Sequence, residues 1–225
     1  MSSEGDLEII RAEGTRLADV AESAPHAVIE IYRWDLTGLV VHTGRVHRRT
    51  TEILSQRRTE RISRPPAPET GIIEWFREGV EEMCTAIAET PEDVEVFTFG
   101  MGDRASFWLD RMLLETVVHR WDAENAAGEP SIIPTDLARR GIEEFSRMWA
   151  GLLAPHEKVT FEAEDSGDAW SLISEGDGSR LVPGKGTANI TDTASNLYLW
   201  LMGRIGLDAP ETVTAAIAGL SRPPN

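Results

Sequence analysis

The segment Phe107–Gly128, FWLDRMLLETVVHRWDAENAAG, carries the side chains of this chain that are best suited to chemistry. Placed on an α-helix, Glu115 and His119 stand four positions apart and therefore lie on the same face. A carboxylate oxygen and an imidazole nitrogen are both good zinc ligands. The spacing therefore predicts part of a metal site on one helix.

The polar side chains of this segment fall into two stripes on opposite sides of the helix. One stripe contains Asp110, Arg120 and Glu124, and the other contains Arg111, Glu115, His119 and Asp122. A helix in a bundle presents one face to water, and an unpaired charge on a buried face is costly. We therefore expect one stripe to face inward, and we favour the stripe of Glu115 and His119.

A third ligand must come from elsewhere in the chain, where the remaining histidines are His26, His42, His47 and His156. His42 and His47 lie on a predicted helix, on opposite flanks of its apolar stripe, so the helical phase does not choose between them. Two histidines and one carboxylate would leave one coordination position open, as catalytic zinc sites do. The alternative without a metal is that Arg111 forms a simple salt bridge with Glu115.

The elements that must position these side chains follow from the spacing of apolar residues, which predicts five long helices. These helices span about 7–24, 35–58, 72–89, 105–127 and 135–153. After Pro155 we expect a β-hairpin, a third strand and two helices, at 158–164 with 169–174, 187–190, 192–202 and 210–220. The pattern indicates an α+β chain with a helical bundle over residues 1–154 and a small mixed domain over residues 155–225.

The composition restricts the class of partner. The 225 residues are 41% hydrophobic and 27% charged, an ordinary mix for a globular protein, and the net charge is −16. Such an acidic surface repels phosphate backbones and anionic lipids, so we expect neither nucleic-acid nor membrane binding. No apolar run is long enough to span a bilayer, and the polar first residues do not form a secretory signal, which predicts a cytoplasmic protein.

Cys84 is the only cysteine, which excludes an internal disulfide and a cysteine-based zinc cluster. Its neighbours Val80, Met83 and Ile87 are apolar, so we expect a packed structural thiol rather than a nucleophile. Any thiol chemistry of this chain would then need a thiol supplied from outside.

Two motifs of the predicted bundle resemble those of one known family. RMLLETVVHRWDAENAAG is similar to the segment ending in HRxDxExAxG of the mycothiol-dependent maleylpyruvate isomerase family, and DLTGLVVHTGRVHRRT resembles that family's second-helix motif. Trp34 matches a Trp that precedes this motif, and His42 matches its metal-binding His. AWSLIS and GTANITDTASNLYLWLMGR resemble the small C-terminal domain. The resemblance implies a DinB-like four-helix bundle followed by a small α/β domain.

The same resemblance implies an activity. It implies zinc held by His42, Glu115 and His119, with mycothiol, a thiol of actinobacteria, as cosubstrate. A zinc-activated thiolate would add to a cis alkene conjugated to carbonyls, the bond would rotate, and the thiolate would leave. The partners would be a small electrophile and this low-molecular-weight thiol. Arg204 matches a family position with an active-site role, although an arginine at a helix end also interacts with the helix dipole.

Several alternatives remain open at this level. A mycothiol S-transferase that conjugates electrophiles or a natural-product intermediate would share the thiol and the metal, and a non-catalytic zinc-binding carrier or interaction protein would share the metal alone. His47 is expected on the helix surface or behind a ligand, and Asp122 either orients an imidazole or pairs with an arginine. The family often has Cys-Pro-Gly where this chain has Ile31, Tyr32 and Arg33, which affects the choice of substrate.

Overall fold

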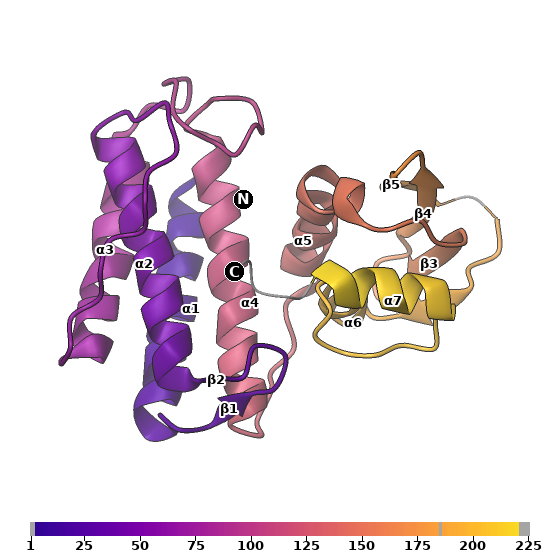
Figure 1. The fold of residues 1–225 in the computed structure, drawn as a ribbon, viewed down its shortest axis with the longest axis horizontal. Helices are drawn as coiled ribbons and strands as arrows, with labels where there is room; N and C mark the ends of the chain where they lie inside the picture. The colour runs from indigo at the N-terminus through magenta and orange to yellow at the C-terminus, as the bar shows by residue number, and fades with distance from the viewer. Residues whose placement is uncertain (1–2, 185, 221–225) are drawn as a thin grey trace. The chain divides into compact units, whose positions relative to one another are not determined.

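The computed structural model describes residues 3–184 and 186–220. The chain forms two compact units, Met1–Ser131 and Ile132–Asn225, and each is described by itself. Helices dominate the first unit and a mixed sheet forms much of the second (Figure 1). The predicted α+β class is therefore confirmed.

The first unit is a four-helix bundle in which α1 packs against α3 and α4, and α2 packs against the same two helices (Figure 1). A short antiparallel pair of strands joins the first two helices. The elements are α1 Ser3–Ser23, β1 Val28–Ile29, β2 Trp34–Asp35, α2 Leu36–Ser55, α3 Ile72–Glu89 and α4 Phe107–Ala126.

The start of α2 is set by Asp35, whose Oδ1 accepts a hydrogen bond of 2.8 Å from the amide of Gly38. This side-chain cap satisfies one of the amides that have no partner within the helix. Because the cap lies at the end of β2, the helix begins directly after Trp34. The local sequence therefore fixes how many turns separate Trp34 from His42.

Both polar stripes of α4 contain buried side chains, which corrects the expectation that only one faces inward. Arg120 and Glu124 are 3% and 2% exposed, and His119 and Asp122 are 5% and 2% exposed. The first stripe can be buried because its charges are paired: Arg120 donates to Glu124 over 2.8 Å, and Glu124 also accepts hydrogen bonds from Arg16 and Ser131. A buried charge with such partners avoids the cost of an unpaired one.

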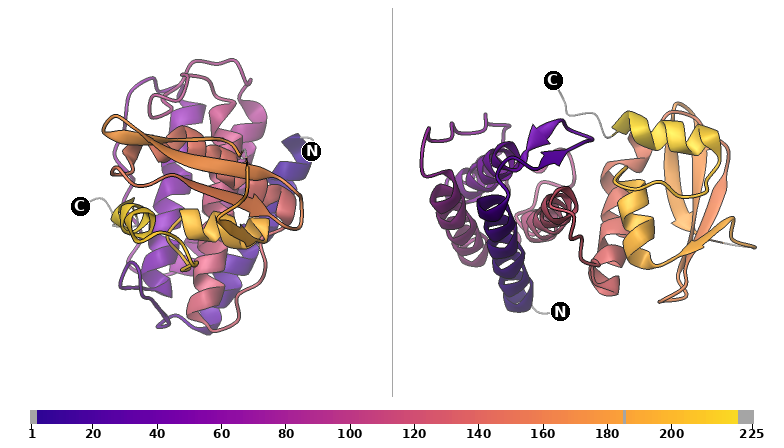
Figure 2. Two further views of the ribbon diagram at one scale, coloured as in Figure 1. Left: turned by 90° about the vertical axis from the view of Figure 1, so that its right-hand side faces the viewer. Right: turned by 90° about the horizontal axis from the view of Figure 1, so that it is seen from below.

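The second unit combines a four-stranded sheet with helices on one of its faces (Figure 2). The strand order is β5-β4-β3-β6, with β3 and β6 parallel and the other pairs antiparallel. The expected hairpin is present as β3 and β4, whereas β5 was not expected. The elements are α5 Thr135–Met148, η1 Ala150–Leu152, β3 Val159–Ala163, β4 Ala169–Glu175, β5 Gly178–Pro183, β6 Ile190–Asp192, α6 Ala194–Leu201 and α7 Glu211–Leu220.

The helix α5 belongs to this second unit, although the sequence pattern suggested a boundary after it, near Ala154. It packs against α6, where Gly141 allows close approach: a Cβ atom at Gly141 would lie 2.4 Å from the ring of Tyr198. An amphipathic helix packs its apolar face against another apolar surface, and the sequence of the helix alone does not identify which surface that is. The compact units therefore divide at Ser131.

None of the helices within the described residues is both long enough and apolar enough to cross a membrane. The apolar residues of the first unit instead meet inside the bundle, where Leu39, Phe76 and Trp108 are fully buried. The core thus lies between the helices that carry the polar side chains discussed next.

Candidate metal centre

The bundle brings together His42 from α2 with Glu115 and His119 from α4. One possible ligand atom from each of the three lies within 4.8 Å of the other two. Nε2 of His119 is 3.3 Å from Oε1 of Glu115, and Nε2 of His42 is 3.7 Å from the same oxygen. Nitrogen and carboxylate oxygen atoms that converge in this way suit a zinc ion. The three side chains could therefore hold a metal ion.

Asp122 holds His119 in the orientation that a metal site needs. Oδ2 of Asp122 lies 2.9 Å from Nδ1 of His119, so Nε2 is left to face Glu115. A carboxylate behind a histidine is the usual second partner of zinc-binding imidazoles. Although burial opposes it, the charge of Glu115 and the hydrogen bond with Asp122 raise the pKa of His119 to about 9.

Arg111 pairs with Glu115 without excluding a metal. Its Nη2 donates a hydrogen bond to Oε2 of Glu115, whereas Oε1 is the oxygen nearest the histidines. Burial would raise the pKa of Glu115, but the charges of Arg111 and His119 hold it well below its usual value. The carboxylate is therefore ionised, and the salt bridge and the ligand set are compatible.

His42 is partly exposed and has an arginine beside it. Nη1 of Arg64, from the loop between α2 and α3, lies 3.3 Å from Nδ1 of His42. Burial is the main cause that lowers the pKa of His42, and the charge of His119 adds to it. The imidazole is therefore neutral at pH 7, which is the form that binds metals.

Tyr32 and Trp34 form an aromatic wall next to the two histidines. The rings of Tyr32 and Trp34 are stacked with centroids 4.9 Å apart, and the ring of Trp34 lies 5.0 Å from that of His42. The ring centroid of Tyr32 in turn lies 6.4 Å from that of His119. Sequence reasoning missed Tyr32 as a site residue, because its only signal was that it departs from the family pattern.

His47 lies in the core and is not one of the three converging ligands. It is fully buried, its ring stacks on Phe76, and its Nε2 is 3.1 Å from Oγ1 of Thr116. Burial lowers its pKa to about 3. Because Thr116 donates its own proton to the carbonyl of Met112, His47 is the donor in this contact. The expectation that His47 lies on the helix surface is therefore wrong. Its hydrogen bond to Thr116 instead links α2 to α4.

Arg204 and Cys84 are not among the three converging ligands. Arg204 follows α6 in the second unit, where its Nη1 donates to the carbonyl of Met202 over 2.8 Å. Its active-site role stays a prediction. Cys84 lies on α3, is fully buried, and has its pKa raised to about 11 by that burial. The expectation that Cys84 is a packed, buried thiol is therefore confirmed.

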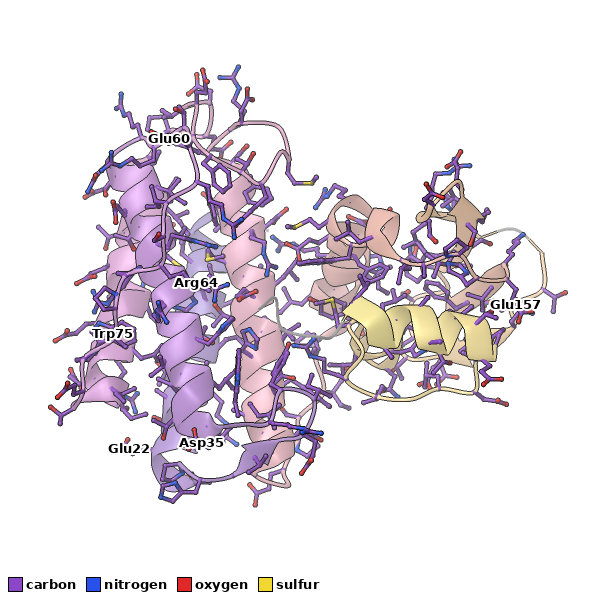
Figure 3. All side chains as sticks on the ribbon, viewed as in Figure 1. Glu22, Asp35, Glu60, Arg64, Trp75 and Glu157 are labelled. Atoms are coloured by element: carbon purple, nitrogen blue, oxygen red, sulfur yellow. The ribbon has the colours of Figure 1, made fainter. Side chains whose placement is uncertain are left out.

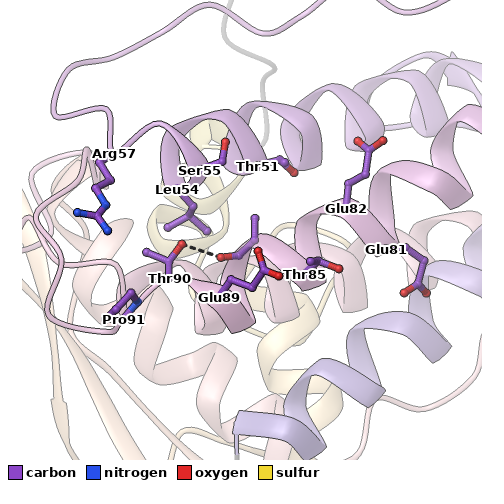
Figure 4. A pocket seen from close by; sticks show the side chains of 11 residues that line it. Thr51, Leu54, Ser55, Arg57, Glu81, Glu82, Thr85, Glu89, Thr90 and Pro91 are labelled. Atoms are coloured by element: carbon purple, nitrogen blue, oxygen red, sulfur yellow. Dashed lines mark hydrogen bonds between the residues drawn. The ribbon is translucent and has the colours of Figure 1, made fainter.

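A surface pocket between α2 and α3 is separate from this cluster (Figure 4). Its lining includes Thr51, Arg57 and the carboxylates of Glu81 and Glu82, but none of the three converging ligands. The convergence of ligand atoms, rather than the size of a pocket, thus marks the candidate site.

Zinc binding at pH 7 is expected to release about one proton, which comes from His119. With a pKa of about 9 this histidine is protonated at pH 7 in the metal-free protein, and it must become neutral to bind a metal. Proton release should therefore decline to zero as the pH rises above 9, and zinc affinity should weaken as the pH falls below it. Calorimetry in buffers of different ionisation enthalpy measures the number of protons released per zinc ion bound. A value of zero at pH 7 would contradict the protonated state of His119 in the metal-free protein.

Comparison with known proteins gives one family match. The family described as the mycothiol maleylpyruvate isomerase N-terminal domain matches residues 7–124. No curated protein sequence matches the chain.

Two solved structures are similar over nearly the whole chain. A crystal structure of a histidine-to-alanine mutant of the mycothiol-dependent maleylpyruvate isomerase has a TM-score of 0.64 at 15% identity, covering 91% of this chain and 90% of that one. A second crystal structure of the mycothiol-dependent maleylpyruvate isomerase has a TM-score of 0.60 at 15% identity, covering 93% and 92%. At this identity the likeness shows that the fold is shared.

Proposed function

The chain belongs to the mycothiol maleylpyruvate isomerase family through its N-terminal domain, and we propose that it is a zinc-dependent enzyme that uses mycothiol to isomerise a maleylpyruvate-like substrate. The observation that carries the proposal is the convergence of His42, Glu115 and His119 within 4.8 Å. Mycothiol is the thiol in the descriptions of the family and of both similar structures.

The proposed site fits a zinc ion by its donor atoms and their supports. His42, Glu115 and His119 would be its ligands, with Asp122 and Arg111 fixing the carboxylate–imidazole pair from behind. A bound zinc ion would lower the pKa of a thiol from roughly 8.5, so that thiolate is available at neutral pH. Three protein ligands leave room for such a molecule.

The residues around the ligands support a reaction shielded from water. Tyr32 and Trp34 place aromatic rings next to His42 and His119, where they reduce contact with solvent. In the isomerisation, the thiolate sulfur forms a bond to one alkene carbon while the π electrons move to the conjugated carbonyl. The remaining single bond rotates, the electrons return, and the carbon–sulfur bond breaks. The thiolate is regenerated and the product has the mass of the substrate.

The test compares products by mass and geometry. Zinc-loaded protein is incubated with mycothiol and maleylpyruvate, and the mixture is analysed by mass spectrometry and NMR. The proposal predicts an isomer of unchanged mass, with mycothiol recovered in full. A stable adduct of substrate and thiol would instead identify an S-transferase. Zinc binding without turnover on a panel of thiols and electrophiles would point to a carrier and overturn the proposal.

Arg204 is proposed to bind a carboxylate of the substrate, and Arg204→Lys is expected to lower turnover about 10-fold or more. Lysine keeps the positive charge but lacks the two-pronged guanidinium that grips a carboxylate. Zinc content and melting temperature should stay at their wild-type values. Steady-state kinetics with both variants measures the effect. Unchanged kinetics would assign Arg204 a structural role, through its bond to the carbonyl of Met202.

A further inference from the structure

Arg49 of α2 is a buried cation that has no anionic partner among the described residues. Arg49 is 6% exposed, and its Nε atom is buried and has no hydrogen-bond partner. Buried charges in proteins are normally paired or bound to a ligand, because removing a charge from water is costly. Arg49 therefore has an unmet capacity to bind an anion.

Other arginines surround Arg49 and make this region positive. The charges that act on it most strongly are those of Arg64 and Glu115, followed by those of Arg61 and Arg111, so three cations stand against one carboxylate. Burial, followed by these neighbouring cations, lowers the pKa of Arg49 to about 10, so it remains charged at pH 7. In a chain whose net charge is −16, such a concentration of arginines is a local exception.

The region adjoins the candidate metal centre. Arg49 follows His42 by seven residues, which places both on the same face of α2, two turns apart. Arg64 contacts His42 directly and lies alongside α2 (Figure 3). The loop that carries Arg64 is fastened to the same helix, because Arg45 donates a 2.8 Å hydrogen bond to the carbonyl of Pro65.

The contact of Arg49 with Phe99 leaves its hydrogen-bonding edge available. The guanidinium carbon lies 5.1 Å from the centre of the Phe99 ring, which covers one face of the planar group. The N–H groups point outward in that plane and are not used by the ring. Phe99 itself has a left-handed φ of 58°, a costly conformation that tends to occur near functional sites.

We propose that Arg49 and Arg64 form a subsite beside the metal centre that binds a carboxylate of the substrate. A planar carboxylate matches the guanidinium fork and would supply the counter-charge that Arg49 lacks. The identification of the anion as the substrate's carboxylate rests on the proposed function. The anion subsite itself is inferred from the arginines alone.

The test measures the binding of succinate, a dicarboxylate that does not react with thiols, to the zinc-loaded protein by calorimetry. Arg49→Gln and Arg64→Gln are each expected to weaken succinate binding about 10- to 100-fold, as loss of a hydrogen bond to a charged group does. Arg49→Lys should lie between Arg49→Gln and the wild type, because it retains the charge without the fork. Arg58→Gln, which alters an exposed arginine near α2, should bind succinate as the wild type does.

Folding and zinc content are checked for each variant, and Arg64→Gln keeps the test decisive if Arg49→Gln does not fold. Wild-type affinity in both glutamine variants overturns the subsite, as does an equal loss in Arg58→Gln. Succinate binding that disappears in metal-free His119→Ala but survives both arginine changes would mean that zinc alone binds the carboxylate, and would also overturn it.

The subsite and the proposed function can fail separately. If isomerisation with mycothiol is absent but succinate binding depends on Arg49, the subsite stands and the proposed function falls. If isomerisation occurs while Arg49→Gln changes neither succinate affinity nor the KM for substrate, the proposed function stands and the subsite falls.

Discussion

Replacing His119 with alanine is expected to leave the purified protein without zinc and to abolish its catalytic activity. The wild type should hold about one zinc per chain, because three ligand atoms converge on one point. Loss of a partner that only orients a ligand weakens metal binding about 10- to 100-fold, and loss of the ligand itself is expected to cost more. Elemental analysis after dialysis measures the zinc content.

Two further variants make this experiment specific. His42→Ala should lose zinc in the same way, since it removes the ligand contributed by α2. His47→Gln is the matched control on the same helix: it can still donate to Thr116 and should keep its zinc. Circular dichroism verifies that each variant is folded. If the His47 variant loses the metal and the His42 variant keeps it, the ligand assignment is wrong.

Omitting the external thiol is expected to abolish turnover entirely, and Cys84→Ala is expected to retain full activity with mycothiol. Burial raises the pKa of Cys84 to about 11, so its thiol is protonated at neutral pH and is a poor nucleophile. Cys84 is also the only cysteine of the chain, so no other internal thiol can replace mycothiol. Turnover with and without added thiol, measured for both proteins, provides the test.

The opposite result would contradict the mechanism directly. Full turnover of the wild type in a thiol-free assay, abolished by Cys84→Ala, would identify the internal thiol as the nucleophile. Replacing mycothiol with glutathione or free cysteine in the same assay also shows how selective the protein is for its thiol. A conservative Cys84→Ser change, which keeps the size of the side chain, separates chemistry from packing.

Periodicity in the sequence was enough to predict much of the bundle. The apolar spacing predicted α1, α2, α3 and α4 with bounds near those observed, because a 3.6-residue period identifies a helix whatever it packs against. The same spacing placed Glu115 and His119 on one face of α4. These are local properties, and they do not depend on the rest of the chain.

The bounds of the two units could not be predicted in this way. The helix α5 looked like a fifth member of the bundle, yet it packs against α6 of the second unit. The strand β5 was missed because Gly178–Pro183 has no clear alternation of apolar and polar residues; it is held by pairing with β4. Such features depend on contacts between distant segments, which local patterns do not encode.

The sequence by itself determined that one carboxylate and one imidazole of α4 lie side by side, and its resemblance to a family named His42 as their partner. Only the tertiary structure decided that His42 meets Glu115 while His47 meets Thr116. Tertiary structure also buried Arg120 and Glu124 of the other polar stripe of α4, and it collected arginines around Arg49. The physical reason is that helical phase gives the direction of a side chain, but only the packing of neighbouring helices decides what it meets there.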